Sequence, residues 1–474
     1  MLTYSFSDLG SDSLYEYLYK CIKQDILNGT LAPGDRLPSK RSFASHLNLS
    51  TITIENAYAQ LLAEGYIYSI PKKGYYAADI SVGAAQTPRA PLPEPITEQA
   101  RGAYFADFTS SQTHPGTFPF STWAKLLREV IGSHRPELME KSPSGGVLPL
   151  RQSIASHLKE FRGMAVRPEQ IIVGAGTEYL YGLLIQLLGH EKIYGVEDPG
   201  YQKIPAIYQS NQVACRHIPM DKHGICISQL KEQGVDIVHI SPSHHFPTGI
   251  VTPIGRRYGL LSWAAEKDGR YIIEDDYDCE FRFMGKPIPS LQSIDVMEKV
   301  IYMNTFTKTL TSTIRISYMV LPAHLMERFH QTMGFYSCTV SNFEQYTLAR
   351  FLQDGHFERH INRMRNFYHN QRDTLLNYLK NSPLSSRITI MEEDAGLHFL
   401  MGVDTSVPDK DILQQAKARN LHMASLSQYY GTECPFGEHT FIMSYSSIAP
   451  ERMEEAISRL CQVFLEPMGS RLDG

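Results

Sequence analysis

The sequence lacks the features of a secreted or membrane-spanning protein. It contains no uncharged apolar run of about 18 residues, and no basic segment followed by an apolar one stands near its start. Cysteine is scarce, with seven scattered residues and no C-x-x-C pair among 474 residues. Neither a disulfide framework nor a cysteine metal site is therefore expected. These absences predict a protein of the reducing cytoplasm.

An excess of positive charge is also missing. The chain has 45 Lys and Arg against 50 Asp and Glu, a formal net charge of −5. This balance excludes general coating of nucleic acid by the whole surface, but it allows a small basic module within the chain. Hydrophobic content of 42% and charged content of 20% are typical of globular proteins. At this length two or more domains are expected.

Apolar periodicity disappears between about Asp79 and Ala103, where alanine, proline, glycine and threonine dominate. This composition predicts a linker over residues 79–104 that proline makes stiff. The linker separates a small N-terminal region, residues 1–78, from a region of enzyme size, residues 105–474.

The N-terminal region predicts three helices followed by a hairpin. The first helix is indicated by apolar residues at helical spacing, namely Leu14, Leu18, Cys21, Ile22 and Ile26. Ser39 and Ser50 are expected N-caps of two short helices, the second with the apolar positions Ile52, Ala57, Leu61 and Leu62. The segments "YIYSI" and "YYAA" around Pro71–Gly74 predict a β-hairpin. The pattern is typical of a winged helix-turn-helix, an α+β domain.

Positive charge is concentrated in this region. Residues 36–73 hold five Lys or Arg and two Asp or Glu, a local net charge of +3. A helix-turn-helix places the start of its second helix against bases while basic side chains contact phosphates. The residues expected to bind double-stranded operator DNA are Arg36, Ser39, Lys40, Arg41, Thr51, Thr53, Lys72 and Lys73. The alternative is a protein-interaction module with a solvated Lys72–Lys73 turn.

The same region resembles the N-terminal domain of GntR-family regulators over nearly its whole length. The resemblance is carried by "LAPGDRLPSKRSFASHL" and "AYAQLLAEGYI". It implies that Arg41 contacts a base, that Thr51 and Thr53 lie on the recognition helix, and that Lys72 and Lys73 lie in the wing.

The C-terminal region predicts an α/β fold. Apolar runs such as "QIIVGAG", "KIYGVEDPG", "VDIVHISPS", "RYIIEDD" and "VIYMNTFTK" alternate with helical stretches, and each ends in small or polar residues. Buried parallel strands have this pattern, and ligands of such sheets gather at the carboxyl ends of the strands.

Polar residues at these strand ends match the needs of a pyridoxal phosphate site. Such a site requires a lysine, a carboxylate opposite the pyridine nitrogen, an aromatic face and phosphate donors. The candidates are Asp275 and Tyr277 after one run, and Thr305, Thr307, Lys308 and Arg315 after the next. The pair His244–His245 could suggest a metal, but no third ligand stands at a sensible spacing.

This region resembles fold-type I aminotransferases, and the two-domain layout resembles the MocR/GabR subfamily of GntR regulators. The resemblance is carried by "GVLPLR", "IIVGAGTE", "EDPGY", "SPSHHFPTG", "IIEDDYDCEFR" and "NTFTKTLTSTIRISY". It implies a fold-type I domain preceded by a winged helix-turn-helix, with pyridoxal phosphate as cofactor.

The resemblance also assigns roles to single residues. Lys308 is the Schiff-base lysine, Asp275 faces the ring nitrogen, Tyr277 faces the ring oxygen and Tyr201 stacks on the ring. Asp276 is the alternative partner of the nitrogen, because the sequence cannot rank adjacent carboxylates. The backbone of Gly176 and Thr177 would hold the phosphate at a helix N-terminus.

Departures from the aminotransferase pattern bear on the ligand. Ile442, in "TFIMSYSS", takes the place of the arginine that binds substrate carboxylates, and Lys203 takes the place of a ligand-binding arginine of the GABA-responsive relative. The segment "HHFPTG" lacks the asparagine of "NPTG".

These features predict a transcription regulator that senses an amine effector, through Lys203, or pyridoxal phosphate itself. The resemblance implies a head-to-tail homodimer in which each DNA-binding arm crosses to the partner subunit. The alternatives are an active aminotransferase with a DNA-binding tether, and a scaffold without ligand.

Overall fold

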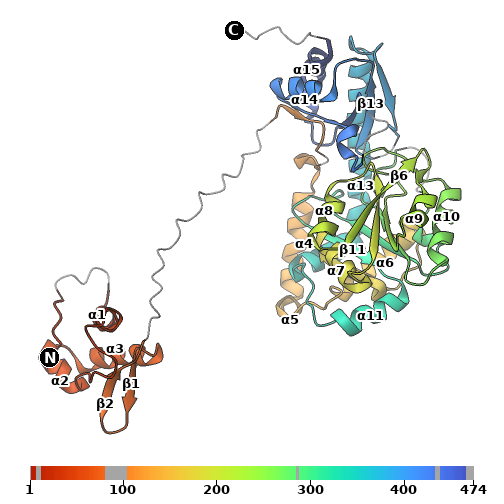
Figure 1. The fold of residues 1–474 in the computed structure, drawn as a ribbon. Helices are drawn as coiled ribbons and strands as arrows, with labels where there is room; N and C mark the ends of the chain where they lie inside the picture. The colour runs from red at the N-terminus through yellow and green to blue at the C-terminus, as the bar shows by residue number, and fades with distance from the viewer. Residues whose placement is uncertain are drawn as a thin grey trace, which may run out of the picture. The chain divides into compact units, whose positions relative to one another are not determined.

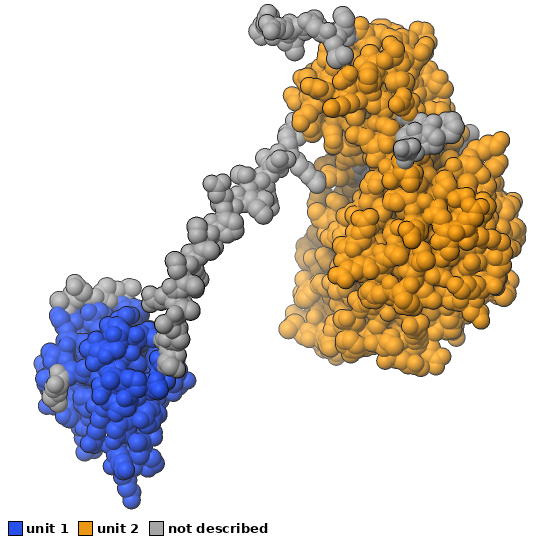
Figure 2. Space-filling model, in the orientation of Figure 1, with its two compact units in different colours: residues 1–100 blue, residues 101–474 orange. Residues whose placement is uncertain are grey.

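The computed structural model describes residues 2–6, 12–80, 104–110, 112–283, 288–394, 396–432 and 438–465. The chain divides into two compact units, Met1–Ala100 and Arg101–Gly474 (Figure 2). Residues 81–103 of the expected linker lie outside the described residues, so the linker stays a prediction. Among the helices that are described, none is both long and apolar enough to cross a bilayer.

The first unit is a winged helix-turn-helix (Figure 1). Its elements are α1 (Leu14–Leu27), α2 (Lys40–Leu47), α3 (Thr51–Ala63), β1 (Ile67–Ile70) and β2 (Gly74–Ala77). The two strands form an antiparallel hairpin that pairs Ile67 with Ala77. Both predicted N-caps are confirmed, because the Ser39 hydroxyl accepts from the Ser42 amide and the Ser50 hydroxyl accepts from the Thr53 amide.

The predicted apolar face of α3 was partly wrong. The buried residues are Ile54, Ala57, Tyr58 and Leu61, whereas Ile52 is 68% exposed. Ile52 lies two positions before Ile54, which is about 200° around the helix axis. The side chain therefore points away from the core.

The second unit contains an eight-stranded sheet with the order β4-β11-β10-β9-β8-β5-β6-β7. The strands are β4 (Ile171–Ala175), β5 (Ile193–Asp198), β6 (Ala214–Asp221), β7 (Gly224–Ile225), β8 (Ile237–Ile240), β9 (Tyr271–Asp275), β10 (Val300–Thr305) and β11 (Ile316–Val320). The five predicted strand runs are β4, β5, β8, β9 and β10. The sequence did not predict β11, which lies between β4 and β10 and is antiparallel to both.

Helices cover both faces of this sheet (Figure 1). They are α4 (Phe120–Ser133), α5 (Arg135–Met139), α6 (Leu148–Arg162), α7 (Thr177–Leu188), α8 (Lys203–Ser210), α9 (Ile227–Glu232), α10 (Ile254–Ala265), α11 (Ala323–Met333), α12 (Asn342–Gln353) and α13 (His356–Lys380). Along β10, Tyr302 packs into the core under α4, α6 and α12, while Ile301 and Met303 pack under α7 and α11. This alternation decides which face each strand-end residue reaches.

A smaller part of the same unit is built on a four-stranded antiparallel sheet with the order β12-β13-β16-β15. Its strands are β12 (Ile388–Met391), β13 (His398–Val403), β15 (Ala424–Ser425) and β16 (Thr440–Ser444), and Figure 1 shows α14 (Asp409–Ala418) and α15 (Met453–Leu465) beside it. A short parallel pair joins β3 (Ala106–Asp107) to β14 (Leu421–His422). One apolar core joins α13, α15 and strands β13 and β16.

Candidate functional site

The basic residues of the first unit are mostly exposed. Arg36, Arg41, Lys72 and Lys73 are all solvent-exposed, the last two at the tip of the hairpin. Thr51 begins the recognition helix and is also exposed. Such side chains can approach a duplex without any rearrangement of the core.

Three of the predicted DNA contacts also have structural roles. Lys40 Nζ donates to Glu55 Oε1 at 2.6 Å, which joins α2 to α3. This hydrogen bond raises the pKa of Lys40 above the ordinary lysine value. The Ser39 hydroxyl caps α2, and Thr53 lies half-buried with its amide bonded to Ser50.

Ile52 is a surface residue that the sequence analysis placed in the core. It follows Thr51 in the leading turn of α3 with most of its side chain in solvent. Its position two residues after the Ser50 cap was the signal that could have identified it. An apolar side chain at this position has the chemistry that contacts thymine methyl groups.

The second unit has a cavity of about 620 Å³ at the carboxyl ends of its parallel strands. All the predicted cofactor and effector residues line it, namely Gly176, Thr177, Tyr201, Lys203, Asp275, Tyr277, Thr305, Thr307, Lys308 and Arg315. The cavity therefore brings together residues that are more than 130 positions apart in the chain.

Lys308 follows β10 by three residues and lines the cavity. Burial lowers the pKa of the Lys308 amine below its ordinary value, because the charged form is poorly solvated there. The carboxylate of Asp278 partly offsets this shift of the pKa. The lowered pKa increases the fraction of neutral amine, and the neutral amine is the form that acts as a nucleophile.

The two adjacent carboxylates, at the end of β9 and directly after it, lie on opposite faces of the sheet. Asp275 lines the cavity, on the face of α7. Asp276 Oδ2 instead lies 2.6 Å from Arg162 Nη2 of α6, and both side chains are almost completely buried. Tyr302 also donates to Asp276 at 2.8 Å. The alternation of side chains along a strand separates the pair.

The Asp275 carboxylate has protein partners on one oxygen. Tyr181 donates to Oδ2 at 2.5 Å, and His239 Nε2 lies 3.5 Å from the same atom. Oδ1 is buried, and no hydrogen bond to it is found among the described residues. The carboxylate is thus held firmly while one acceptor oxygen stays available to a group in the cavity.

A cradle of backbone and guanidinium lies at the start of α7. Gly176 has a φ of +92°, and a Cβ there would lie 2.4 Å from Arg315 Nη2, so only glycine permits this approach. The N-terminus of the 12-residue helix α7 follows at Thr177. Helix N-termini and arginine both favour anions.

Glu178 connects two cations at the mouth of the cavity. Arg315 Nη2 lies 3.1 Å from Glu178 Oε2, and Lys203 Nζ pairs with Glu178 Oε1. The bond to Lys203 is the main reason that the pKa of Glu178 is lowered below its ordinary value. Lys203 therefore lies at the cavity, but its charge is already balanced by a carboxylate that the sequence analysis did not single out. Its role in effector binding stays a prediction.

The two threonines before Lys308 form a small network. The Thr305 hydroxyl donates to Thr307 Oγ1 at 2.7 Å and accepts from Ser317 at 2.8 Å. Thr305 is buried, whereas Thr307 is half-buried and nearer to solvent. Of the two, Thr307 is the better placed to contact a ligand.

An aromatic and apolar wall closes another side of the cavity. The rings of Tyr201 and Tyr429 both contact the edge or face of Phe246, with centroid distances of 5.8 and 5.4 Å. Behind them Ile442 is fully buried with Leu400, Ala424 and Leu426. The position expected for a carboxylate-binding arginine is thus filled by apolar packing.

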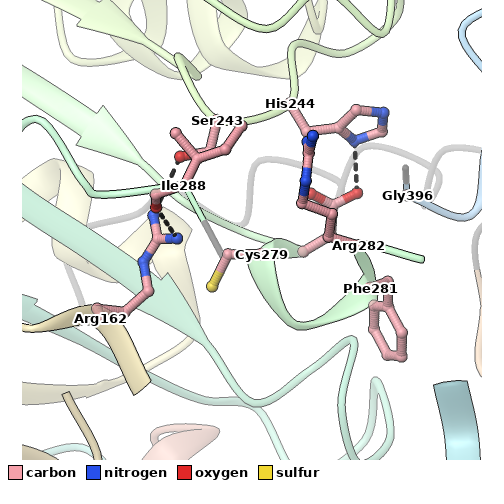
Figure 3. Close-up of a pocket in the computed structure, with 9 residues that line it drawn as sticks. Arg162, Ser243, His244, Cys279, Phe281, Arg282, Ile288 and Gly396 are labelled. Atoms are coloured by element: carbon pink, nitrogen blue, oxygen red, sulfur yellow. Dashed lines mark hydrogen bonds and ion pairs between the residues drawn. The ribbon is translucent and has the colours of Figure 1, made fainter. Parts of the chain in front are cut away.

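A smaller pocket lies around Cys279 (Figure 3). His244 Nδ1 and Asp278 Oδ2 are 2.8 Å apart in its wall, and Arg162 donates to the Ser243 hydroxyl at 3.1 Å. Sequence reasoning missed Arg162, Tyr181, His239 and Asp278, because helix and strand positions of this kind carry no motif of their own. Among the described residues no group of three or more His, Cys, Asp or Glu could hold a metal ion.

Comparisons with known proteins agree for both units. Residues 14–76 match the family of bacterial regulatory proteins, gntR family. The uncharacterized HTH-type transcriptional regulator YdeL of Bacillus subtilis is 37% identical over 94% of this chain and 96% of its own length. The probable rhizopine catabolism regulatory protein MocR of Rhizobium meliloti is 30% identical over 95% of this chain and 94% of its own. The pyridoxine biosynthesis transcriptional regulator PdxR of Corynebacterium glutamicum is 29% identical over 88% and 89%.

Solved structures support the fold of the second unit. The multiple substrate aminotransferase of Thermococcus profundus superposes with a TM-score of 0.66 at 22% identity, covering 77% of this chain and 91% of that protein. An archaeal alanine:glyoxylate aminotransferase gives a TM-score of 0.68 at 20% identity, covering 77% and 91%. The fold is thus that of a GntR-type winged helix-turn-helix joined to a fold-type I aminotransferase domain. The chain belongs to the MocR-type regulators of the GntR family, and this confirms the resemblance found in the sequence.

Proposed function

We propose that this DNA-binding transcription regulator binds pyridoxal phosphate in the cavity of its second unit and uses it to sense a small molecule. The observation that carries the proposal is the joint placement of Lys308, with an amine whose pKa is lowered, and Asp275, with one unpaired carboxylate oxygen, in one cavity. The relatives are named as HTH-type transcriptional regulators, which favours regulation over metabolic turnover.

The residues present fit the cofactor. Lys308 Nζ would bond its aldehyde carbon and Asp275 Oδ1 would accept from its ring nitrogen, while Tyr277 would face the ring oxygen and Tyr201 the ring. Gly176, Thr177, Thr307 and Arg315 would surround the phosphate, with Thr305 supporting Thr307. When bound, pyridoxal phosphate supplies an aldehyde that reacts with primary amines and a ring that withdraws electrons.

The effector side of the cavity disfavours simple α-amino acids. Ile442 cannot form the paired hydrogen bonds that a carboxylate needs, and the wall in front of it is aromatic. A desolvated carboxylate without a charged partner loses more free energy than its other contacts return. The effector is therefore pyridoxal phosphate itself or an amine with another anchor group, for which Lys203 is the candidate cation.

Binding of such an effector can alter DNA affinity only if it favours one of two arrangements of the protein. We propose that the protein acts as a homodimer, with a head-to-tail exchange of the DNA-binding arms as its arrangement. Phe120, Met139 and Phe335 of the second unit are each more than two-thirds exposed, which suits burial against a second copy. Light scattering of the purified full chain tests this, with a monomeric mass as the contradicting result.

The main experiment is an absorbance titration of the full chain with pyridoxal phosphate, followed by a panel of amines. Wild type should develop the visible band of a protein-bound cofactor. Lys308→Ala should lose it, because Lys203, the other lysine in the described lining of the cavity, is paired with Glu178. Lys267→Ala, on the surface beside Asp236, is the matched control. A band that survives Lys308→Ala would show that the lysine assignment is wrong.

The second candidate function is an active aminotransferase, which the fold alone would permit. Incubation with common α-amino acids should release little or no keto acid, because the carboxylate site is apolar. Keto acid release at enzyme-like rates, about 1 per second or faster, would overturn the regulator reading of this cavity.

A further inference from the structure

A buried histidine and carboxylate, His244 and Asp278, line the smaller pocket around Cys279, in which Figure 3 labels His244. His244 lies in the loop after β8, and Asp278 follows β9 by three residues. The atoms His244 Nδ1 and Asp278 Oδ2 are 2.8 Å apart, and each side chain is 5% exposed. The hydroxyl of Tyr277 lies 3.4 Å from the same nitrogen. The pair therefore contacts a residue that lines the cavity.

The imidazole of His244 is held in place by the smaller part of the unit. Gly396, at a φ of +72°, approaches so closely that a Cβ there would lie 1.9 Å from His244 Cε1. The ring of His398, the first residue of β13, lies 5.1 Å from the His244 ring. Close packing on this side leaves the Nδ1 edge directed at Asp278 and Tyr277.

Charged and titratable groups face His244 from every element around it. They are Tyr277, Asp278 and Arg282 after β9, Glu392 after β12, His398 on β13 and His245 in its own loop. Burial alone lowers the pKa of His244, but Asp278 outweighs it and leaves the net pKa above the ordinary value, with Glu392 adding and Arg282 opposing. Burial lowers the pKa of His245 and of His398 to about 3, so both are neutral.

Asp278 connects this pair to Lys308. Its negative charge opposes the lowering of the Lys308 pKa that burial causes. A proton on His244 compensates that charge, because the two groups form a buried ion pair. The protonation state of His244 thus determines how much of the Asp278 charge Lys308 experiences.

We infer that His244 and Asp278 form a positioning dyad that fixes the Tyr277 hydroxyl and sets the charge beside Lys308. The dyad is separate from the groups that would touch the cofactor. The inference rests on the proposed function only in taking Lys308 as the reactive amine, so it is first tested without cofactor.

The test measures the reactivity of Lys308 against pH in the full chain, by competitive acetylation and mass spectrometry. His244→Asn leaves Asp278 uncompensated, so the Lys308 pKa should rise by about one unit. Asp278→Asn removes both charges, because His244 then stays neutral, so the Lys308 pKa should stay near its wild-type value. The double variant should match Asp278→Asn, because a buried His244 without its carboxylate stays neutral. His324→Asn, at a surface histidine, is the control.

A merely structural pair would shift the Lys308 pKa equally in all three variants or in none of them, and either result would overturn the inference. If the variants fail to fold, the pKa of the His244 imidazole is measured in the wild-type protein by nitrogen NMR. A pKa at or below the ordinary histidine value of about 6.5 would contradict the dyad, and a higher pKa would support it.

Titration of the visible band of the cofactor-loaded protein provides the second readout, with shifts in the same directions. A Lys308 pKa that rises in His244→Asn and returns in the double variant, without any cofactor binding, would refute the proposed function and leave the dyad intact. Cofactor binding without those shifts would refute the dyad alone.

Discussion

The two units of this protein place their functional charges in opposite environments. In the first unit Arg36, Arg41, Lys72 and Lys73 stand in solvent at the ends of short elements. In the second unit Asp275 at the cavity is buried, and so is the pair of Arg162 with Asp276 on the other face of the sheet. Lys203, Glu178 and Arg315 at the cavity are partly exposed but paired with one another. The difference suits the proposed partners: a DNA duplex brings its own charge to an open surface, whereas a small molecule must replace interactions inside a cavity.

This comparison predicts how each unit responds to substitution. Exposed charges act nearly independently, so their removal weakens binding and leaves the fold intact. Buried pairs are coupled, so the removal of one member leaves the other desolvated. The substitutions that follow are ordered from the largest expected effect to the smallest.

Arg162→Met should have the largest effect on stability. Arg162 is paired with Asp276 at 2.6 Å and also donates to the Ser243 hydroxyl and the Ile288 carbonyl. Breaking such a buried pair costs about 3–5 kcal/mol of unfolding free energy, measured by urea unfolding with Trp123 and Trp263 as probes. The double variant Arg162→Met, Asp276→Asn should recover much of the loss. A loss below about 1 kcal/mol would contradict the coupling.

Glu197→Gln should remove a pH dependence of stability in the second unit. Burial raises the pKa of Glu197 to about 8, so the folded state keeps the proton. Stability from this proton is fully present below the unfolded pKa of about 4.3, and is lost as pH rises to about 8. The wild type should thus lose of the order of a few kcal/mol between pH 5 and pH 8 that the variant keeps.

Glu197→Gln preserves the acceptor for the Ser241 amide, which now lies 2.9 Å away. Glu169→Gln, at an exposed position, is the control. Parallel stability curves for wild type and Glu197→Gln over this pH range would show that Glu197 does not hold a proton.

Arg41→Ala should reduce selectivity between operator and random DNA by about 1–3 kcal/mol, as for a base-contacting arginine. Lys72→Ala or Lys73→Ala should weaken binding to all sequences about equally and reduce its salt dependence. Fluorescence anisotropy at several salt concentrations separates the two behaviours. Unchanged operator selectivity in Arg41→Ala would remove the base-contacting role.

Ser50→Ala should have the smallest effect, a loss of about 1 kcal/mol from the N-cap of α3. The Ser50 hydroxyl accepts from the Thr53 amide at 3.0 Å. Hydrogen exchange over α3 measures the loss, because both tryptophans lie in the second unit. Ser42→Ala, exposed on α2, is the control. Equal protection of α3 in both variants would mean that the cap contributes nothing.

The dyad of His244 and Asp278 extends the same comparison. Each of its side chains is only 5% exposed, and the loss of His244 alone is expected to raise the pKa of Lys308. Exposed pairs such as Lys20 with Asp12 in the first unit have no comparable effect on the pKa of a neighbouring group, because water screens their charges.

The sequence by itself determined the local structure of this protein. Serines at N-cap positions located α2 and α3, and apolar runs located β4, β5, β8, β9 and β10, because capping and strand burial depend on neighbours in the chain. The motif around Lys308 also located this lysine just after a strand, because the end of a strand likewise depends on neighbours in the chain.

Tertiary structure decided what depends on packing between distant segments. It buried Ile54 instead of Ile52, inserted β11 between β4 and β10, and directed Asp275 and Asp276 to opposite faces. It also placed Glu178 between Lys203 and Arg315, and Gly396 against His244. None of these contacts has a sequence signal, because each joins groups whose separation along the chain says nothing about their separation in space.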